Sequence, residues 1–392
     1  MKEIYLDNSA TTALSDAARE AMLAAMENYG NPSSLHERGQ RAAALLRASR
    51  EAVGEALGER HLADGQLIFT ASGTEANNLA LIGTMTAKAR NKGKKLIVGE
   101  TEHPSVIEAA KHLESLGYKV AYIPSPNGVF DMQKYKEELS SDTVLVSAML
   151  VNNETGAMND IAEISKMAKA VSPDILVHCD AVQGFLKTAV CPLPHADMVT
   201  ISAHKIGGPK GVGALYVSEK VLKTKSVVPV IFGGGQENGY RSGTENVIGI
   251  AGFGAAAKSG ASHLTKMLGD FAELRAYFVE KYSDLLGDGV RINEPASKTK
   301  APHIISLTVS GFKSETLLHS LSGYGVYVSS GSACASNTGH ASYVLHSFGL
   351  SDNDADSTLR ISLGEQNTKE DIDVLLSALK ESMAKLARIK RR

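Results

Sequence analysis

A thiol and an amine far apart in the sequence are the side chains whose surroundings most directly suggest chemistry. Cys334 lies among small residues in SSGSACAS (329–336), and Lys205 ends SAHK (202–205) after an apolar run. A lysine in a desolvated, cationic pocket has a lowered pKa and can form a Schiff base with a carbonyl group. A Schiff-base lysine and a thiol on a flexible loop could together remove sulfur from an amino acid and carry it. A buried, inert thiol is the alternative for Cys334, and its serine and glycine neighbours argue against it.

Two further stretches have the residue types that bind phosphate. TASGTE (70–75) leads from an apolar run into a helical pattern, and backbone N–H groups and hydroxyls at a helix N-terminus bind anions. Ser202 and His204, beside Lys205, would add donors for the same phosphate. Residues 233–246 contain a glycine-rich turn followed by RSGTEN, and this loop could close over an anion. The alternatives are an ordinary capped helix and a flexible surface loop.

A pyridinium cofactor needs a carboxylate that keeps its ring nitrogen protonated, because the protonated ring then accepts electrons. Asp180 ends an apolar, strand-like run, and Gln183 follows where it could reach the ring's oxygen. A buried Asp180 would require a cationic or hydrogen-bond-donating partner, and helix capping is its alternative role. His103, in EHPS (102–105), could stack on the ring face, although a lone histidine is more often simply packed or exposed.

These side chains are spread over short apolar runs that alternate with helical patterns. Helices are predicted over 16–57, with a break at 29–32, and from residue 75 onward. The predicted strands are 66–70, 95–98, 120–123, 144–151, 175–180 and 198–202. Such alternation favours a largely parallel sheet covered by helices on both faces. Polar residues at the carboxyl ends of such strands converge on a ligand, and Thr70, Asp180 and Ser202 lie at these ends.

After about residue 255 the pattern changes to that of a second, smaller α/β domain. A charged helical stretch is predicted over 264–286 and a helix from residue 315. The remaining predicted elements are strands at 304–309 and 359–363 and a last helix over 369–389.

Composition limits the classes of protein to which the chain can belong. Its 392 residues suffice for two domains, and the formal net charge of −2 argues against direct binding of nucleic acid or another polyanion. No apolar run is long enough for a membrane span or a secretory signal, so a cytoplasmic location is expected. Cys179, Cys191 and Cys334 form no CxxC pair, which argues against disulfides and a structural zinc site. Cys179 and Cys191 are expected to be structural.

Taken together, the motifs resemble those of the NifS/IscS-type cysteine desulfurases, which are class V, fold-type I pyridoxal-phosphate enzymes. The matching stretches run nearly the full length in family order and are YLDNSATT (5–12), GNPSSLH (30–36), VNNETG (151–156), DAVQ (180–183), SAHK (202–205), RSGTEN (241–246) and SSGSACAS (329–336). The family usually has TSGATE where this chain has TASGTE, so Gly73 stands one place later while Thr74 keeps its position.

The resemblance implies an α/β, fold-type I PLP-dependent transferase fold and a homodimer. Its large, mostly parallel sheet domain flanked by helices would span 16–255, and a smaller α/β domain carrying the Cys334 loop would combine 1–15 with 256–392. The cofactor would be pyridoxal 5'-phosphate, held by Lys205 as the Schiff-base lysine, Asp180, Gln183, His103, Gly73, Thr74, Ser202, His204 and, from the other subunit, Thr244. Asn153 and Arg360 would bind the substrate carboxylate.

The activity that the resemblance implies is removal of sulfur from L-cysteine, with L-alanine as product and a persulfide on Cys334. Lys205 would move the α-proton, and His103 would be the acid–base group near the thiols. The sulfur would pass to an acceptor such as an iron–sulfur scaffold, a tRNA-thiolation protein or a thiamine-pathway carrier.

Three alternatives to that activity stay open. The first is a selenocysteine lyase, which has the same chemistry with selenium. The second is another class V enzyme such as an aminotransferase, which would not need Cys334. The third is a non-catalytic relative that binds a scaffold protein, against which Lys205, Asp180 and Cys334 all count.

Overall fold

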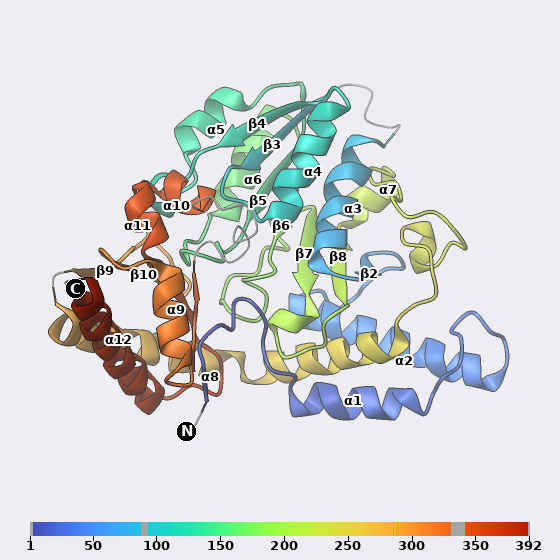
Figure 1. The fold of residues 1–392 in the computed structure, drawn as a ribbon. Coiled ribbons are helices and arrows are strands. Elements are labelled where there is room, and N and C mark those ends of the chain that lie inside the picture. Colours follow the sequence, from blue (N-terminus) through green and yellow to red (C-terminus); the bar gives the residue numbers. More distant parts are fainter. Residues whose placement is uncertain (1–2, 88–92, 288, 331–341, 391–392) are drawn as a thin grey trace.

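A seven-stranded sheet within the described residues organises the larger part of the molecule (Figure 1). The computed structural model describes residues 3–87, 93–287, 289–330 and 342–390. In spatial order the strands are β2 (Leu67–Thr70), β8 (Gly213–Val217), β7 (Met198–Ser202), β6 (Leu176–Asp180), β5 (Thr143–Met149), β3 (Lys95–Gly99) and β4 (Lys119–Ile123). The pairs from β7 to β4 are all parallel, which confirms the predicted largely parallel sheet. Strand β8, which the sequence analysis did not predict, runs antiparallel to both β2 and β7.

Inner strands of this sheet such as β5 and β6 are buried on both faces, and their alternate side chains enter two different cores. Val146 and Val177 belong to a core that also contains residues of the helices α2 and α6. Their neighbours Leu145 and Leu176 belong to a core shared with the helices α3 and α4. The helices of this part are α1 (Asp16–Met26), α2 (Glu37–Leu57), α3 (Gly73–Met85), α4 (Pro104–Ser115), α5 (Met132–Glu138), α6 (Ile161–Val171) and α7 (Glu219–Lys223), with 3-10 turns η1 (Pro126–Gly128), η2 (Ala203–Lys205) and η3 (Glu237–Gly239).

A second region is built around an antiparallel sheet, which in the described part of the chain has four strands. Their order is β12 (Ser329–Ser330), β13 (Thr358–Ser362), β10 (Ile304–Val309) and β9 (Val290–Ile292). Beside it, β1 (Ile4–Tyr5) pairs in parallel with β11 (Val326–Tyr327). The accompanying helices are α9 (Ser314–Ser322), α10 (Tyr343–Phe348), α11 (Asp352–Asp356) and α12 (Lys369–Lys390). Ile4 and Leu6 are buried in the core of this region, so the N-terminal strand is packed with residues from the last third of the chain.

One long helix, α8 (Val247–Leu286), begins well before the helix predicted at 264. Glycines lower helix propensity, and they obscured the first part of α8 in the sequence. The structure gives the reason for two of them. A Cβ at Gly252 would lie 2.7 Å from Met22 Cγ of α1, and one at Gly254 would lie 2.7 Å from Ser49 Cα of α2. These glycines therefore allow α1 and α2 to approach α8 closely, and α8 continues across the predicted domain boundary at residue 255.

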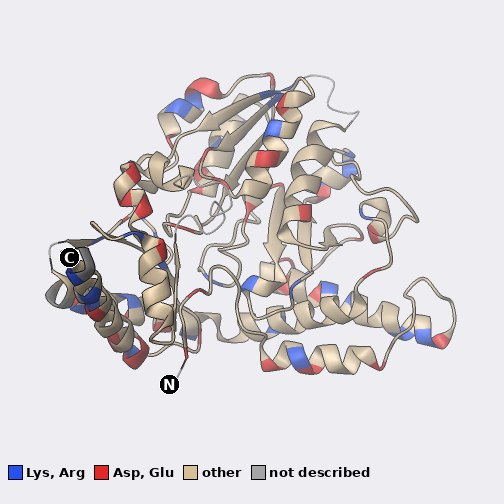
Figure 2. Cartoon of the chain, viewed as in Figure 1, with Lys and Arg blue, Asp and Glu red and all other residues tan. Residues whose placement is uncertain are grey.

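Charged side chains are distributed over the outer helices. Figure 2 shows acidic and basic positions interspersed along helices such as α2 and α12. Within the part of the chain that the structure describes, none of the helices combines the length and hydrophobicity that crossing a bilayer requires.

Candidate active site

A pocket of about 430 Å³ opens at the carboxyl ends of the central strands of the large sheet. Met149 ends β5, Asp180 ends β6 and Ser202 ends β7, and all three line the pocket. Its described lining includes ten of the residues predicted for the site, namely Gly73, Thr74, His103, Asn153, Asp180, Gln183, Ser202, His204, Lys205 and Arg360. The convergence that the sequence indicated is thus present for Asp180 and Ser202. Thr70, the third residue predicted at a strand end, is buried at the end of β2 and is not among the described residues that line the pocket.

Asp180 is buried and accepts two hydrogen bonds. Asn77 Nδ2 donates to Asp180 Oδ2 at 2.8 Å, and the backbone N–H of Val182 donates to Asp180 Oδ1 at 3.0 Å. These donors are the partners that a buried carboxylate requires, as the sequence analysis expected. Asn77, on α3, was not identified from the sequence, because an asparagine within a helical pattern gives no local signal of its partner.

A chain of hydrogen bonds links Asp180 to His103. Asn77 Nδ2 also donates to Ser105 Oγ at 2.9 Å, and Ser105 Oγ lies 2.8 Å from His103 Nδ1. His103 caps α4, and its Nδ1 accepts from the backbone N–H of Ser105 at 3.1 Å. Because Nδ1 is an acceptor, a neutral ring carries its proton on Nε2. Burial lowers the pKa of His103, Asp180 opposes that shift and Lys205 adds to it, which favours the neutral imidazole.

The turn that enters α3 is shaped for a close approach. Ser72 is the N-cap, and its Oγ accepts from the backbone N–H of Glu75 at 3.2 Å. A Cβ at Gly73 would lie 3.0 Å from Val182 Cγ2 and 3.5 Å from Ser202 Cβ. Gly73 is therefore the first helical residue at a position where a side chain would crowd the pocket wall. Capping and anion binding are compatible here, because the amides of a helix's first turn include donors that the cap does not use.

His204 has cationic neighbours. Burial, the largest cause, and the charges of Lys205, Lys210 and Lys187 together lower the pKa of His204 to about 4. Its Nδ1 lies 3.2 Å from Thr11 Oγ1. A neutral ring surrounded by lysines suits a site that receives an anion.

Lys205 reaches across the pocket to the N-terminal segment. It lies in η2, just after β7, and its Nζ donates to the carbonyl oxygens of Ser9 at 2.5 Å and Ala10 at 2.8 Å. Gln183 Nε2 donates to the same Ser9 oxygen at 2.8 Å. Ser9 and Ala10 also line the pocket. The backbone of residues 8–10, which we call the N-terminal strap, was missed as part of the site because carbonyl groups leave no trace in the residue types.

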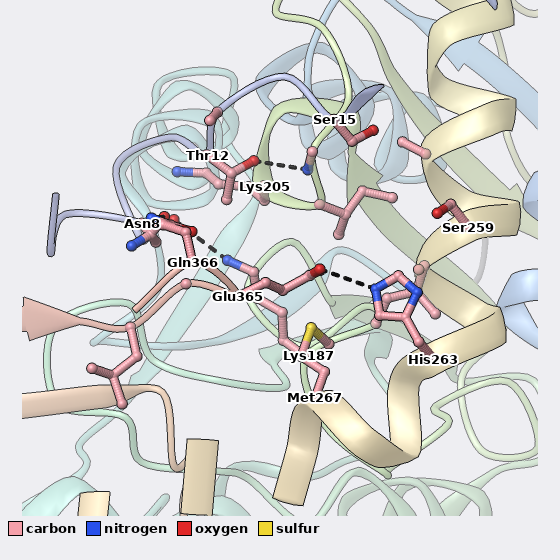
Figure 3. A pocket seen from close by; sticks show the side chains of 18 of the residues that line it. Asn8, Thr12, Ser15, Lys187, Lys205, Ser259, His263, Met267, Glu365 and Gln366 are labelled. Atoms are coloured by element: carbon pink, nitrogen blue, oxygen red, sulfur yellow. Dashed lines mark hydrogen bonds and ion pairs between the residues drawn. The ribbon is translucent and has the colours of Figure 1, made fainter. Parts of the chain in front are cut away.

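A second cavity, of about 220 Å³, lies on another side of Lys205 (Figure 3). It contains the buried Lys187, whose Nζ donates to the carbonyl oxygen of Asn8 at 3.4 Å. Burial, the largest cause, and the charges of Lys205 and Arg360 together lower the pKa of Lys187 to about 7, against an opposing effect of Glu365. Two lysines therefore bind the N-terminal strap. Lys187 donates to the carbonyl group of Asn8, and Lys205 donates to those of Ser9 and Ala10.

Arg360 is a buried side chain of β13, contrary to the surface position considered as its alternative. Its NH2 forms an ion pair with Asp7 Oδ1 at 2.8 Å, and its NH1 donates to the carbonyl oxygen of Asn153 at 3.2 Å. Its buried Nε has no hydrogen-bond partner among the described residues. An arginine held in place with a donor to spare is suited to binding a carboxylate.

Two predicted residues are not among the described residues that line this pocket. Thr244 is exposed on the loop after η3, where the predicted contact to a second subunit stays a prediction. Cys334 lies outside the described residues, so its predicted role also stays a prediction. Of the other cysteines, Cys179 is buried, and Cys191 is exposed with its Sγ 3.2 Å from the carbonyl oxygen of Leu57. Among the residues that the structure describes, no group of three or more histidine, cysteine and acidic side chains could hold a metal ion.

The residues present fit a pyridoxal phosphate group. Ser202 Oγ and Gln183 Oε1 are buried in the pocket without a hydrogen-bond partner among the described residues. Buried polar atoms of this kind are rare in native structures and call for an explanation such as a ligand. Beside them stand a buried carboxylate, a lysine, and a glycine at a helix N-terminus, which match the ring nitrogen, the aldehyde and the phosphate of the cofactor.

Comparisons with known proteins agree with this chemistry. The aminotransferase class-V family model matches residues 4–375. The cysteine desulfurase IscS of Dictyoglomus turgidum is 39% identical over 99% of this chain and 96% of its own length. A solved NifS-like protein, 33% identical, covers 98% of this chain and 100% of its own with a TM-score of 0.89. The structure of SspA in complex with cysteine, 29% identical, covers 92% of this chain and 99% of its own with a TM-score of 0.77.

Proposed function

Because this chain belongs to the class-V aminotransferase family, we propose that it is a pyridoxal 5'-phosphate-dependent cysteine desulfurase. It would release L-alanine from L-cysteine and keep the sulfur as a persulfide on Cys334. The observation that carries the proposal is the pocket itself, in which Lys205, Asp180 and Arg360 converge from distant parts of the sequence. The near-full-length similarity to proteins named cysteine desulfurase supports the same activity.

The cofactor-binding residues would divide the binding of the ring, the aldehyde and the phosphate among them. When bound, the cofactor supplies an electron sink that stabilises negative charge at the substrate's α-carbon. Asp180 would hold the ring nitrogen, Gln183 the ring's oxygen, and His103 would stack on the ring face. Lys205 would carry the cofactor and move the α-proton. The phosphate would be bound by Gly73, Thr74, Ser202 and His204, together with Thr244 of a second subunit.

Arg360 and Asn153 would bind the carboxylate of L-cysteine. The guanidinium is fixed by Asp7 and by the backbone of Asn153, so little side-chain entropy is lost when the substrate binds. A fixed carboxylate also orients the substrate's α-carbon and thiol. This orientation is needed because reacting atoms must be held close together for efficient catalysis.

Sulfur transfer would proceed by attack of the Cys334 thiolate on the substrate sulfur. A sulfur–sulfur bond forms as the bond between sulfur and the substrate's β-carbon breaks. The electron pair of the broken bond stays with carbon, which takes up a proton to become the methyl group of L-alanine. His103, whose neutral form is favoured because burial lowers its pKa, would be the group that moves protons between the thiols.

The partners and domains implied by the family resemblance belong to the same proposal. The enzyme would be a cytoplasmic homodimer that passes sulfur to an acceptor protein such as an iron–sulfur scaffold. Residues 16–255 would form the large domain, and 1–15 with 256–392 the small one. The burial of Ile4 and Leu6 in the same core as residues of β10 and β13 supports joining the N-terminus to the small domain.

The test is to mix the purified protein and pyridoxal phosphate with L-cysteine and a reductant, and to measure alanine and sulfide. Cys334→Ala is assayed in parallel, with Cys191→Ala as the matched control at an exposed thiol. Alanine and sulfide from the native protein and the control, but not from Cys334→Ala, are the expected result. A yellow protein that makes no alanine would instead favour selenocysteine or another amino acid as substrate. A colourless one would favour the non-catalytic alternative.

A further inference from the structure

A buried amine in the second cavity has no task in the mechanism above. Lys187 lines this cavity of about 220 Å³ and is only 5% exposed (Figure 3). Among the described residues its Nζ has one hydrogen-bond partner, the carbonyl oxygen of Asn8 at 3.4 Å. The nearby Glu365 places its Oε2 3.1 Å from His263 Nε2 instead. An ammonium group has three protons to donate, so one long hydrogen bond satisfies the charged form of Lys187 poorly.

A tight turn after β6 places Lys187 inside the molecule. The backbone N–H groups of Lys187 and Thr188 both donate to the carbonyl oxygen of Gly184, at 3.0 and 3.1 Å. Leu186, directly before the lysine, has a φ of +52°. The left-handed region is unusual for a bulky residue, and such strain persists only where the surrounding structure fixes it. The fold therefore holds Leu186 and Lys187 side by side in the lining of the cavity.

The cavity around the amine suits a small and mainly apolar compound. Leu186 lines it from the turn, and Met267 and Phe271 line it from α8. Its volume is about half that of the active-site pocket, 220 against 430 Å³. The lining also includes Glu365 and Gln366, which are exposed, so a compound can enter from solvent without passing through the active site.

The electrostatic surroundings keep much of the amine in its neutral form. The charged and titratable groups around it come from several elements and are Lys205, Arg360, Glu365, His204, His263 and His303. Burial, the largest cause, and the charges of Lys205 and Arg360 together lower the pKa of Lys187 to about 7. Burial and cationic neighbours that include Lys187 also lower the pKa values of His204 and His303. At pH 7 about half of such an amine is neutral, against fewer than about one in 10³ ordinary lysines.

We propose that Lys187 is a second Schiff-base lysine, which reacts with a short aliphatic aldehyde that enters this cavity. The neutral nitrogen adds to the carbonyl carbon, the carbonyl oxygen leaves as water with both protons of the nitrogen, and a carbon–nitrogen double bond remains. The apolar walls receive the aliphatic chain. The neutral imine nitrogen has no proton to donate to Asn8, so the adduct also removes the contact between Lys187 and the N-terminal strap. The reaction requires neither the cofactor nor L-cysteine, so it is independent of the proposed function.

The experiment treats the native holoenzyme with propanal and sodium cyanoborohydride, which reduces the imine to a stable amine. Peptide mass mapping gives the rate of adduct formation at Lys187 and at Lys166, an exposed lysine of α6 that serves as internal reference. Both rates are measured between about pH 6 and pH 9. Ser259→Leu enlarges a side chain that lines the cavity, and Thr265→Leu at an exposed position of α8 is the matched control.

At pH 7 we expect Lys187 to be modified about tenfold faster or more than Lys166, because its larger neutral fraction outweighs its narrower access. The rate at Lys187 should level off above about pH 8, whereas the rate at Lys166 keeps rising, since an ordinary lysine stays protonated to about pH 10. Ser259→Leu should slow the reaction of Lys187 several-fold and leave that of Lys166 unchanged. Thr265→Leu should change neither rate.

Three results would each overturn the inference. The first is an adduct at Lys187 that forms no faster than the one at Lys166. The second is a rate at Lys187 that rises with pH in parallel with that at Lys166. The third is an unchanged rate at Lys187 in Ser259→Leu, which would mean that the aldehyde does not enter through the cavity. Because L-cysteine is absent from these measurements, failure of the desulfurase assay and failure of this inference are distinguishable.

Discussion

The two walls of the pocket are built in different ways. One wall consists of strand ends and helix starts of the large sheet, such as Asp180 and His103, which are joined through Asn77 and Ser105. The other wall consists of the N-terminal strap and β13. There, Asn8 Nδ2 donates to the carbonyl oxygen of Ser362 at 2.9 Å, across a sequence separation of 354 residues.

The two walls of the pocket are therefore expected to have different functions. The sheet wall carries groups predicted to act on the cofactor, and two of them, Asp180 and His103, are held by neighbours within the same sheet and its helices. The strap wall carries Arg360 and the carbonyl groups that receive Lys205, and it is held by contacts between the chain's two ends. Variants in the first wall should therefore lower kcat, and variants in the second should raise KM.

The largest effect is expected at Lys205, the side chain that joins the two walls. Lys205→Ala removes both the group that would carry the cofactor and the proton-transfer group. The turnover rate should fall on the order of 10³-fold or more. Steady-state alanine production measures this, with the exposed Lys166→Ala on α6 as the control. Substantial activity in Lys205→Ala would show that another group moves the α-proton.

Within the sheet wall, Asp180→Asn should lower kcat by about 10²-fold. The amide keeps the size of the side chain but cannot hold the ring nitrogen protonated. The phosphate contacts remain, so the absorbance of the bound cofactor should still be seen. A large rise in KM with kcat unchanged would contradict the division of work between the two walls.

Within the strap wall, Arg360→Ala should mainly raise KM for L-cysteine. Loss of a hydrogen bond to a charged group costs about 1.5–3 kcal/mol, which corresponds to about 10–150-fold in KM. Asp7→Asn is the matched variant, because it removes the ion-pair partner and leaves the guanidinium in place. Its effect on KM should be smaller. Equal effects of the two variants would mean that Arg360 acts by holding the strap.

The smallest effect is expected at Glu154, in the pH dependence of the protein's free energy of unfolding. Because its pKa is raised from 4.5 to about 7, the folded protein holds a proton that the unfolded chain releases between these values. The contribution of Glu154 to stability therefore falls as pH rises through this window, and Glu154→Gln lacks that fall. Between pH 5.5 and pH 7.5, the free energy of unfolding of Glu154→Gln should therefore rise by about 2 kcal/mol relative to that of the native protein. If the difference in unfolding free energy between Glu154→Gln and the native protein does not change with pH, the pKa of Glu154 is not raised.

The sheet wall could be predicted because its signals are local. Apolar runs ending in a polar residue identified β6 and β7, and with them Asp180 and Ser202. Strand β8 was missed because it begins at Gly213, directly after a glycine-rich stretch, and glycine is depleted in strands. The first part of α8 was missed because the glycines that allow close packing are weak helix formers.

The strap wall could not be predicted from residue types alone. Whether Arg360 is exposed or buried depends on Asp7 and Asn153, which come from other parts of the chain. The family resemblance, rather than the local pattern, placed Arg360 in the site. The role of Ser9 and Ala10 depends on their backbone carbonyl groups, which every residue has, so only the fold distinguishes them.

The continuous helix α8 has a consequence for any attempt to divide or recombine this protein. Its 40 residues rise about 60 Å, at 1.5 Å each. Phe253, near the start, is buried in the core of the large sheet, and Phe278, near the end, is buried in the core of the small region. A cut at residue 255 would leave each fragment with an unpaired piece of helix and an exposed apolar face. A chimaera between relatives should therefore inherit α8 from one parent, because side chains of this single helix are packed in both cores.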